Sequence, residues 1–180
     1  QGIYAYADGS TTTMSITADG TVESTNDTGI YARHYGSGDM TITTTNAAGN
    51  AQVTGYNYGI NTRNEGDGAL SIAVNNVTST NDTAIYAYGG NSSTSLSITA
   101  DGTVQSDGYA CIYARHRGTG DLTITATNAA GNAQVTGNSR GISSRVYNGA
   151  TTITANNVTA SGSQGIYAYS GGGQDSITTT

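Results

Sequence analysis

Residues 29–55 read GIYARHYGSGDMTITTTNAAGNAQVTG, and residues 111–137 read CIYARHRGTGDLTITATNAAGNAQVTG. The ends of the two stretches, 45–55 and 127–137, are identical. Each stretch begins with a small residue followed by Ile, and this pair recurs seven times, at Ile3, Ile30, Ile60, Ile85, Ile112, Ile142 and Ile166. A regular period in this range is typical of stacked structural repeats, so the pattern predicts a solenoid.

The spacing of these isoleucines also repeats, which defines a larger unit. Ile85, Ile112 and Ile142 follow Ile3, Ile30 and Ile60 at one constant offset, so the intervals recur after every third isoleucine. We therefore expect about seven coils, grouped by threes into super-repeats at approximately 1–82 and 83–164, with a partial one at 165–180. No linker interrupts the pattern, so residues 1–180 are predicted to be a single segment of a longer repeat array.

Two further apolar positions in each coil predict its strands. A second isoleucine follows each first one roughly a dozen positions later, and a valine then follows in six coils. Around the second isoleucine, apolar and polar residues alternate, as in Met14-Ser15-Ile16-Thr17-Ala18, which is the pattern of a half-buried strand. Three short strands per coil follow, and the predicted fold class is an all-β parallel β-solenoid. The second isoleucines are Ile16, Ile42, Ile72, Ile98, Ile124, Ile153 and Ile177, and the valines are Val22, Val53, Val77, Val104, Val135 and Val158.

Every third coil contains an insertion of about five residues before its valine, at 46–50 and again at 128–132. The two insertions lie three coils apart, so we expect both loops on one side of the solenoid, roughly 14 Å from each other. Asp-Gly and Asn-Asn pairs, such as Asp19-Gly20 and Asn75-Asn76, are expected at the corners because these residues favour tight turns.

Composition excludes several classes of protein. The net charge is −6 and the only basic residues are six arginines, whereas a nucleic-acid surface needs a strongly basic stripe. No apolar run is long enough to span a bilayer as a helix. One Cys excludes a disulfide within the chain, and Cys111 occupies the small-residue position before Ile112, which predicts a buried, structural thiol.

Alternation around the first isoleucine places two columns of side chains on the outside of the solenoid. Tyr and Arg dominate both columns, which predicts a ladder of stacked rings and guanidinium groups. The same residues could form a surface for sugars or proteins. Nearby Asp39, Glu65, Asp67 and Asp121 are expected to balance the arginines. The first column contains Tyr4, Tyr31, Asn61, Tyr86, Tyr113, Ser143 and Tyr167, and the second contains Tyr6, Arg33, Arg63, Tyr88, Arg115, Arg145 and Tyr169.

A second outward surface is a double file of Thr and Ser on the second strand of each coil. Such a flat file is the arrangement by which β-solenoid antifreeze proteins resemble an ice lattice. Thr is also a common exposed strand residue, and Ala73 interrupts the file. The threonines concerned are Thr17, Thr41, Thr43, Thr99, Thr123, Thr125, Thr152 and Thr154.

Catalytic and metal-binding constellations are not evident. His34 and His116 are three coils apart, too distant to share a metal ion, and we expect both to be solvated corner residues. Asp19 and Asp101 are explained by their Asp-Gly corners, and no carboxylate pair is placed for hydrolysis. The sequence therefore predicts no enzyme, no cofactor and no metal site.

The stretches 29–55 and 111–137 resemble the passenger repeats of bacterial autotransporters, in which a Gly-Ile strand, a Gly-x-Gly-Asp corner and a Leu/Met-Thr-Ile-Thr strand recur once per coil. This resemblance implies a right-handed β-helix at the cell surface of a Gram-negative bacterium. Its motifs are structural, so the resemblance supplies a fold and a location rather than a site.

Three functions are compatible with these features. The first is an extracellular stalk or filament segment that associates with itself, end to end or side to side, because open strand edges pair with other edges. The second is recognition of ice, or of host or biofilm glycans or proteins, through the Tyr/Arg columns or the Thr file. The third, a polysaccharide-degrading enzyme, is supported only by fold analogy. Nucleic acid is not an expected partner.

Overall fold

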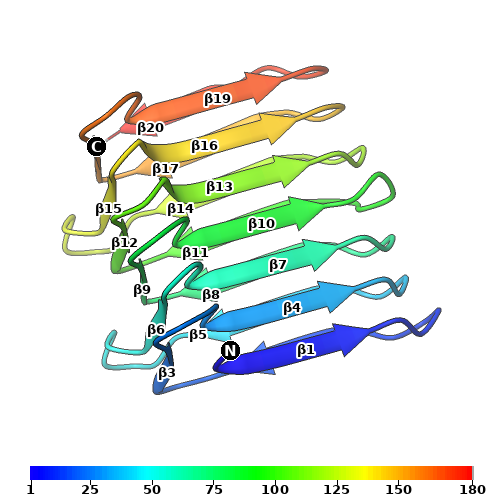
Figure 1. Cartoon of the computed structure of the whole chain (residues 1–180). Helices are drawn as coiled ribbons and strands as arrows, with labels where there is room; N and C mark the ends of the chain where they lie inside the picture. The colour runs from blue at the N-terminus through cyan, green and yellow to red at the C-terminus, as the bar shows by residue number, and fades with distance from the viewer. Residues whose placement is uncertain (180) are drawn as a thin grey trace.

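Twenty short strands build the computed structural model, which describes residues 1–179. They form three parallel sheets that run along a rod, with one strand from each sheet in the first six coils and strands of two sheets in the seventh (Figure 1). Sheet A contains β1 (Ile3–Ala7), β4 (Ile30–His34), β7 (Ile60–Asn64), β10 (Ile85–Gly89), β13 (Ala110–His116), β16 (Arg140–Val146) and β19 (Ile166–Ser170). Sheet B contains β2 (Met14–Thr17), β5 (Met40–Thr44), β8 (Leu70–Val74), β11 (Leu96–Ala100), β14 (Leu122–Ala126), β17 (Thr151–Ala155) and β20 (Ser176–Thr179). Sheet C contains β3 (Thr21–Ser24), β6 (Gln52–Gly55), β9 (Asn76–Ser79), β12 (Thr103–Ser106), β15 (Gln134–Gly137) and β18 (Asn157–Ala160).

The coils stack in the register that the isoleucine spacing predicts. In sheet A, Ile3 pairs with Ile30, Ile30 with Ile60, and the same alignment continues to Ile166. The predicted parallel β-solenoid with three strands per coil and about seven coils is therefore confirmed. Within residues 1–179, no helix has the length and apolar character needed to cross a bilayer.

The core is a thin column filled by the three apolar positions of each coil. Ile30, Ile42 and Val53, one from each sheet of the second coil, are completely buried. Each such side chain contributes about 1.5–3 kcal/mol by leaving water. Repetition along the rod, rather than a wide interior, supplies the hydrophobic stabilisation of this Gly- and Thr-rich chain.

Close packing explains the small residue that precedes each first isoleucine. A Cβ atom at Gly59 would lie 2.4 Å from Cγ1 of Val77 in the same coil and 2.8 Å from the carbonyl oxygen of Ala84. Cys111 occupies the same position in a later coil, is fully buried, and donates its thiol to the carbonyl oxygen of Val104 at 2.6 Å. The predicted structural thiol is confirmed.

The two inserted loops protrude on the same side of the rod, as expected (Figure 1). The Asn46 side chain closes the first loop by donating to Oδ1 of Asn50 at 2.8 Å and to the carbonyl oxygen of Asp19 at 2.6 Å. Asn128 makes the equivalent bonds in the second loop. Gly49 and Gly131 are the residues with positive φ in the described chain, both at 68°, so the left-handed conformation occurs in the loops and not at the Asp-Gly corners.

The prediction that His34 and His116 are solvated is wrong, because both side chains are completely buried. The inward alternation of Ile30 and Ala32 continues for one further step to His34, and the same holds for His116 after Ile112 and Ala114. His34 lies in a column at the corner between sheets A and B that is buried in the middle coils and half-buried at its two ends, Ala7 and Ser170. This column contains Ala7, His34, Asn64, Gly89, His116, Val146 and Ser170.

Candidate functional site: the tyrosine and arginine face of sheet A

Both predicted outward columns lie on the outer face of sheet A. Tyr4 aligns with Tyr31, and Tyr86 aligns with Tyr113, on adjacent strands. The rings of these two pairs stack in parallel, with centroids 5.4 Å and 5.5 Å apart. Asn61 and Ser143 occupy the same column and break the ladder into separate pairs.

The second column combines arginines with tyrosines and, in one place, with a carboxylate. Arg63 lies over the ring of Tyr88, its neighbour in the next coil, at 5.7 Å from the centroid. Glu65 lies 3.6 Å from a guanidinium nitrogen of Arg33 and 3.9 Å from one of Arg63, so the predicted balancing role is confirmed for Glu65.

The other three acidic residues do not balance the arginines. The Asp39 and Asp121 carboxylates accept the backbone N–H groups of Ala69 and Ala150 in the following coil. Asp67 is exposed and forms no ion pair with any residue in 1–179. Asp39 and Asp121 are therefore corner residues that join successive coils.

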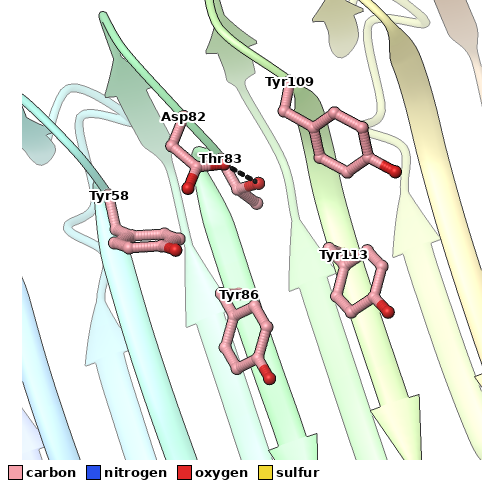
Figure 2. Close-up of a pocket in the computed structure, with 6 residues that line it drawn as sticks. All are labelled: Tyr58, Asp82, Thr83, Tyr86, Tyr109 and Tyr113. Atoms are coloured by element: carbon pink, nitrogen blue, oxygen red, sulfur yellow. Dashed lines mark hydrogen bonds between the residues drawn. The ribbon is translucent and has the colours of Figure 1, made fainter.

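A groove of about 270 Å³ opens beside the first column at the corner between sheets C and A. Figure 2 shows its six lining residues, with Tyr86 and Tyr113 side by side on neighbouring strands and Tyr58 and Tyr109 flanking them. Asp82 and Thr83 come from the turn that precedes β10, and Oδ1 of Asp82 accepts a hydrogen bond from the Thr83 hydroxyl at 3.1 Å. We call this site the tyrosine groove.

The groove presents hydroxyl donors beside one carboxylate. Burial of Tyr58, together with the adjacent Asp82 carboxylate, raises the pKa of Tyr58 to about 12. Burial also raises the pKa of Tyr86. Both phenols are therefore protonated at neutral pH, and the Tyr58 hydroxyl is directed at the Asp82 carboxylate. The Tyr86 ring is stacked on Tyr113 and has the Arg63 guanidinium 5.6 Å from its centroid, so its hydroxyl edge rather than its faces is open to a ligand. Such a combination of hydroxyl groups and a carboxylate can bind a polar compound through hydrogen bonds.

Several members of this face were missed in the sequence because they lie just outside the strands. Tyr35, Arg117 and Tyr147 each follow a strand of sheet A and continue the outward alternation of Arg33, Arg115 and Arg145 by one step. Arg33 lies 4.8 Å from the Tyr35 ring centroid, and Arg115 lies 5.2 Å from that of Tyr147. Extending the outward alternation by two residues would have found all three.

The predicted Thr file lies on the outer face of sheet B. Its members align from strand to strand, with Ala73 between Thr43 and Thr99. The Ser97 hydroxyl donates to the Ser71 hydroxyl at 3.2 Å, on the adjacent strand of the same file. Ice binding by this face stays a prediction, which an ice-recrystallisation assay of Thr43→Leu and Thr125→Leu would test.

Metal binding finds no support in the arrangement of the described residues. Within 1–179, no group of three or more His, Cys, Asp or Glu side chains is close enough to hold an ion. Burial raises the pKa of the Cys111 thiol, which disfavours the thiolate that metals and electrophiles require.

Comparison with known proteins adds no further assignment to this face. The chain matches no protein family model, and no curated protein or solved structure matches it. The functional argument therefore depends on the chain's own residues.

Proposed function

We propose that this chain is a structural segment of an extracellular bacterial surface protein, a rigid rod of the autotransporter passenger type. The observation that carries this proposal is the unbroken register of three parallel sheets, from β1 to β19 in sheet A and from β2 to β20 in sheet B. Each coil adds one layer of hydrogen bonds and one layer of core without changing the cross-section. A chain of this kind extends in length at constant width, which is what a stalk or filament requires.

The proposed role is non-enzymatic, and the sameness of the coils supports it. The three-coil unit repeats its inserted loop and its Ile and Val core positions, as in the closing bonds of Asn46 and Asn128. Selection for shape would maintain such repetition, whereas a catalytic site needs one unique constellation.

Cell-surface labelling tests this proposal. Antibodies against the chain should label intact cells of the source organism, and external protease should remove the signal. Addition of one further three-coil super-repeat within the parent protein should lengthen the surface projection by about 14 Å without loss of folding. Labelling only after cell lysis would contradict the proposal.

Glycan binding in the tyrosine groove is a second candidate function, favoured by the parallel Tyr86 and Tyr113 rings beside Asp82. Tyrosine hydroxyl groups beside a carboxylate can hydrogen-bond the hydroxyl groups of a sugar. The chain itself suggests substitutions that the fold tolerates at this position, because the same column carries Asn61 and Ser143 in other coils.

Screening on a glycan array should therefore give ligands that Tyr86→Asn and Tyr113→Ser lose. The matched control is Tyr4→Ser, which breaks the other stacked pair and leaves the groove intact. Equal loss in the control variant would assign the signal to the general surface rather than to the groove.

A further inference from the structure

The second super-repeat carries a cluster of arginines that have no acidic partner among residues 1–179. Glu65 makes both of the ion pairs found within residues 1–179, and both are in the first super-repeat. Four arginines of the later coils, which we call the arginine cluster, are therefore not neutralised by a carboxylate of the described chain. They are Arg115, Arg117, Arg140 and Arg145.

Comparison of the two super-repeats shows how the cluster arises on an unchanged scaffold. The offset that aligns Ile30 with Ile112 also aligns Glu65 with Tyr147, Tyr35 with Arg117, and Tyr58 with Arg140. Residues 1–82 contain two arginines and eight acidic residues, a charge of −6, whereas residues 83–164 contain four and three, a charge of +1. The acidic group that joins Arg33 to Arg63 in the first copy is thus absent between Arg115 and Arg145 in the second.

Tyr147 takes the place of that acidic group and organises the arginines around it. The Arg115 guanidinium donates to the Tyr147 hydroxyl at 2.6 Å. The guanidinium carbons of Arg115 and Arg117 lie 5.2 Å and 5.4 Å from the Tyr147 ring centroid. The Nε atoms of Arg115 and Arg117 are buried and have no hydrogen-bond partner within the described chain. Desolvation acts to raise the pKa of Tyr147, but hydrogen bonds from Arg115 and Arg145 outweigh it and lower that pKa, as expected beside concentrated positive charge.

Arg140 and Arg145 extend the cluster along the rod. Arg140 donates to the Tyr109 hydroxyl and to Oε1 of Gln164, each at 3.1 Å, and lies 4.9 Å from the Tyr167 ring centroid. Arg145 lies 5.5 Å from the ring centroid of Tyr169, which is 46% exposed. Because Arg115 and Arg145 are directly paired on adjacent strands, their charges follow one another along the rod axis, with strands roughly 4.8 Å apart.

We propose that the arginine cluster binds an anionic polysaccharide that carries sulfate or carboxylate groups. Planar guanidinium groups recognise these oxyanions through paired hydrogen bonds, and the exposed Tyr169 ring at the end of the cluster offers flat surface to a sugar ring. The axial arrangement suits a linear polyanion that lies along sheet A. The −6 charge of the first super-repeat repels polyanions of every kind, so the contact is confined to the length of the arginine cluster. This inference goes beyond the structural role and does not depend on it.

Titration calorimetry with dextran sulfate at roughly 50 mM salt tests the proposal. Neutral dextran of the same size is the control. We expect binding of dextran sulfate only, weakening steeply as salt is added. Tyr147→Glu, which restores the residue of the first super-repeat, should weaken binding by about tenfold because the carboxylate would neutralise Arg115 and Arg145. Arg117→Tyr combined with Arg140→Tyr, both also residues of the first super-repeat, should act in the same direction.

The matched control is Gln105→Glu, which makes the same change of charge in the same super-repeat but on sheet C, where the first super-repeat carries Glu23. We expect its affinity to stay within about twofold of the parent. Circular dichroism of every variant shows whether the solenoid is still folded, so loss of the fold is distinguishable from loss of binding. Equal binding of neutral dextran, equal effects of Tyr147→Glu and Gln105→Glu, or tighter binding of a single-stranded oligonucleotide or of anionic vesicles would each overturn the proposal.

Discussion

The Nδ1 atom of His34 lies 3.1 Å from Oδ1 of Asn64, its neighbour in the next coil of the buried corner column. Nε2 of His34 lies 2.9 Å from the carbonyl oxygen of Thr12, so whichever ring nitrogen carries the proton of the neutral imidazole has an acceptor oxygen within reach. In the second super-repeat the same column pairs His116 with Val146, and within the described chain neither ring nitrogen of His116 makes a hydrogen bond of good geometry, although the Gly120 backbone lies nearby. The two copies thus offer a satisfied and an unsatisfied version of one site.

Exchanging Asn64 and Val146, the residues next to the two histidines, should change the free energy of unfolding in opposite directions. Asn64→Val should destabilise the solenoid by about 1–3 kcal/mol, because it leaves a buried imidazole nitrogen without its partner. Val146→Asn should recover about 1 kcal/mol by giving His116 the partner that His34 already has. Urea unfolding followed by circular dichroism measures both changes. Destabilisation by both variants to the same extent would show that volume, rather than hydrogen bonding, decides this position.

His116 should also make stability depend on pH. Burial lowers the pKa of His116 below its usual value, although Asp121 and the Gly120 backbone act in the opposite direction. Above about pH 6.5 the imidazole is neutral in both states and contributes no pH dependence. As the pH falls below that value, the unfolded chain takes up a proton that the folded chain does not, so the free energy of unfolding decreases until the folded pKa is reached.

Urea titrations at pH 7.5 and pH 5.5 measure this loss. His116→Gln has no titrating group at the site and should flatten the profile between these values. An unchanged pH profile in this variant would mean that other groups are responsible.

The fold could be predicted from the sequence because every coil repeats the same inward pattern. Ile30 and Ile112 occupy the same position in two different coils. Because the alternating pattern recurs in seven coils, chance does not account for it. The two buried histidines were predicted to be solvated because His is polar. However, His34 lies two residues after Ala32 and four after Ile30, so the alternation of the strand already indicated an inward side chain. The tyrosine groove was not predictable from the sequence. Tyr58 and Asp82 lie in irregular corners between strands, and the repeat spacing does not indicate where the side chains of such corners point.

At Gly59 the small-residue position should not accept a larger side chain without a shift of its neighbours, although other coils carry Ala84 and Cys111 at the equivalent position. Gly59→Ala places a Cβ atom 2.4 Å from Cγ1 of Val77, and we expect a loss of about 1–3 kcal/mol from overpacking. Gly20→Ala is the matched control, because a Cβ atom there meets nothing within 4 Å and the backbone has no positive φ. That variant should be neutral or stabilise by up to about 1 kcal/mol. Thermal unfolding separates the two, and similar losses in both would indicate a general effect of glycine replacement.

Cys111 should resist modification until the solenoid opens. Its thiol is buried, and burial raises its pKa, so both access and thiolate formation are disfavoured. We expect labelling by a chromogenic disulfide to be complete in denaturant and very slow in buffer. Cys111→Ala combined with Thr119→Cys moves the thiol to an exposed corner and should react at once. Rapid labelling of the parent chain in buffer would mean that the fourth and fifth coils separate readily.

The isolated chain should associate through the outermost coils. Within this chain β1, β2 and β3 lie at one end of their sheets and β19, β20 and β18 at the other, so each keeps one edge without a partner strand. Ile177 continues the core column of sheet B and is 49% exposed at that end. We therefore expect sedimentation to show concentration-dependent growth in length at constant width. Ile177→Lys places a charge on the apolar end of the column and should shift the chain to monomers, whereas Ser163→Lys, on an exposed turn, should not. The unpaired strand edges and the exposed core residues of these end coils are both expected to favour association. A parent chain that stays monomeric at high concentration would therefore contradict the prediction for both.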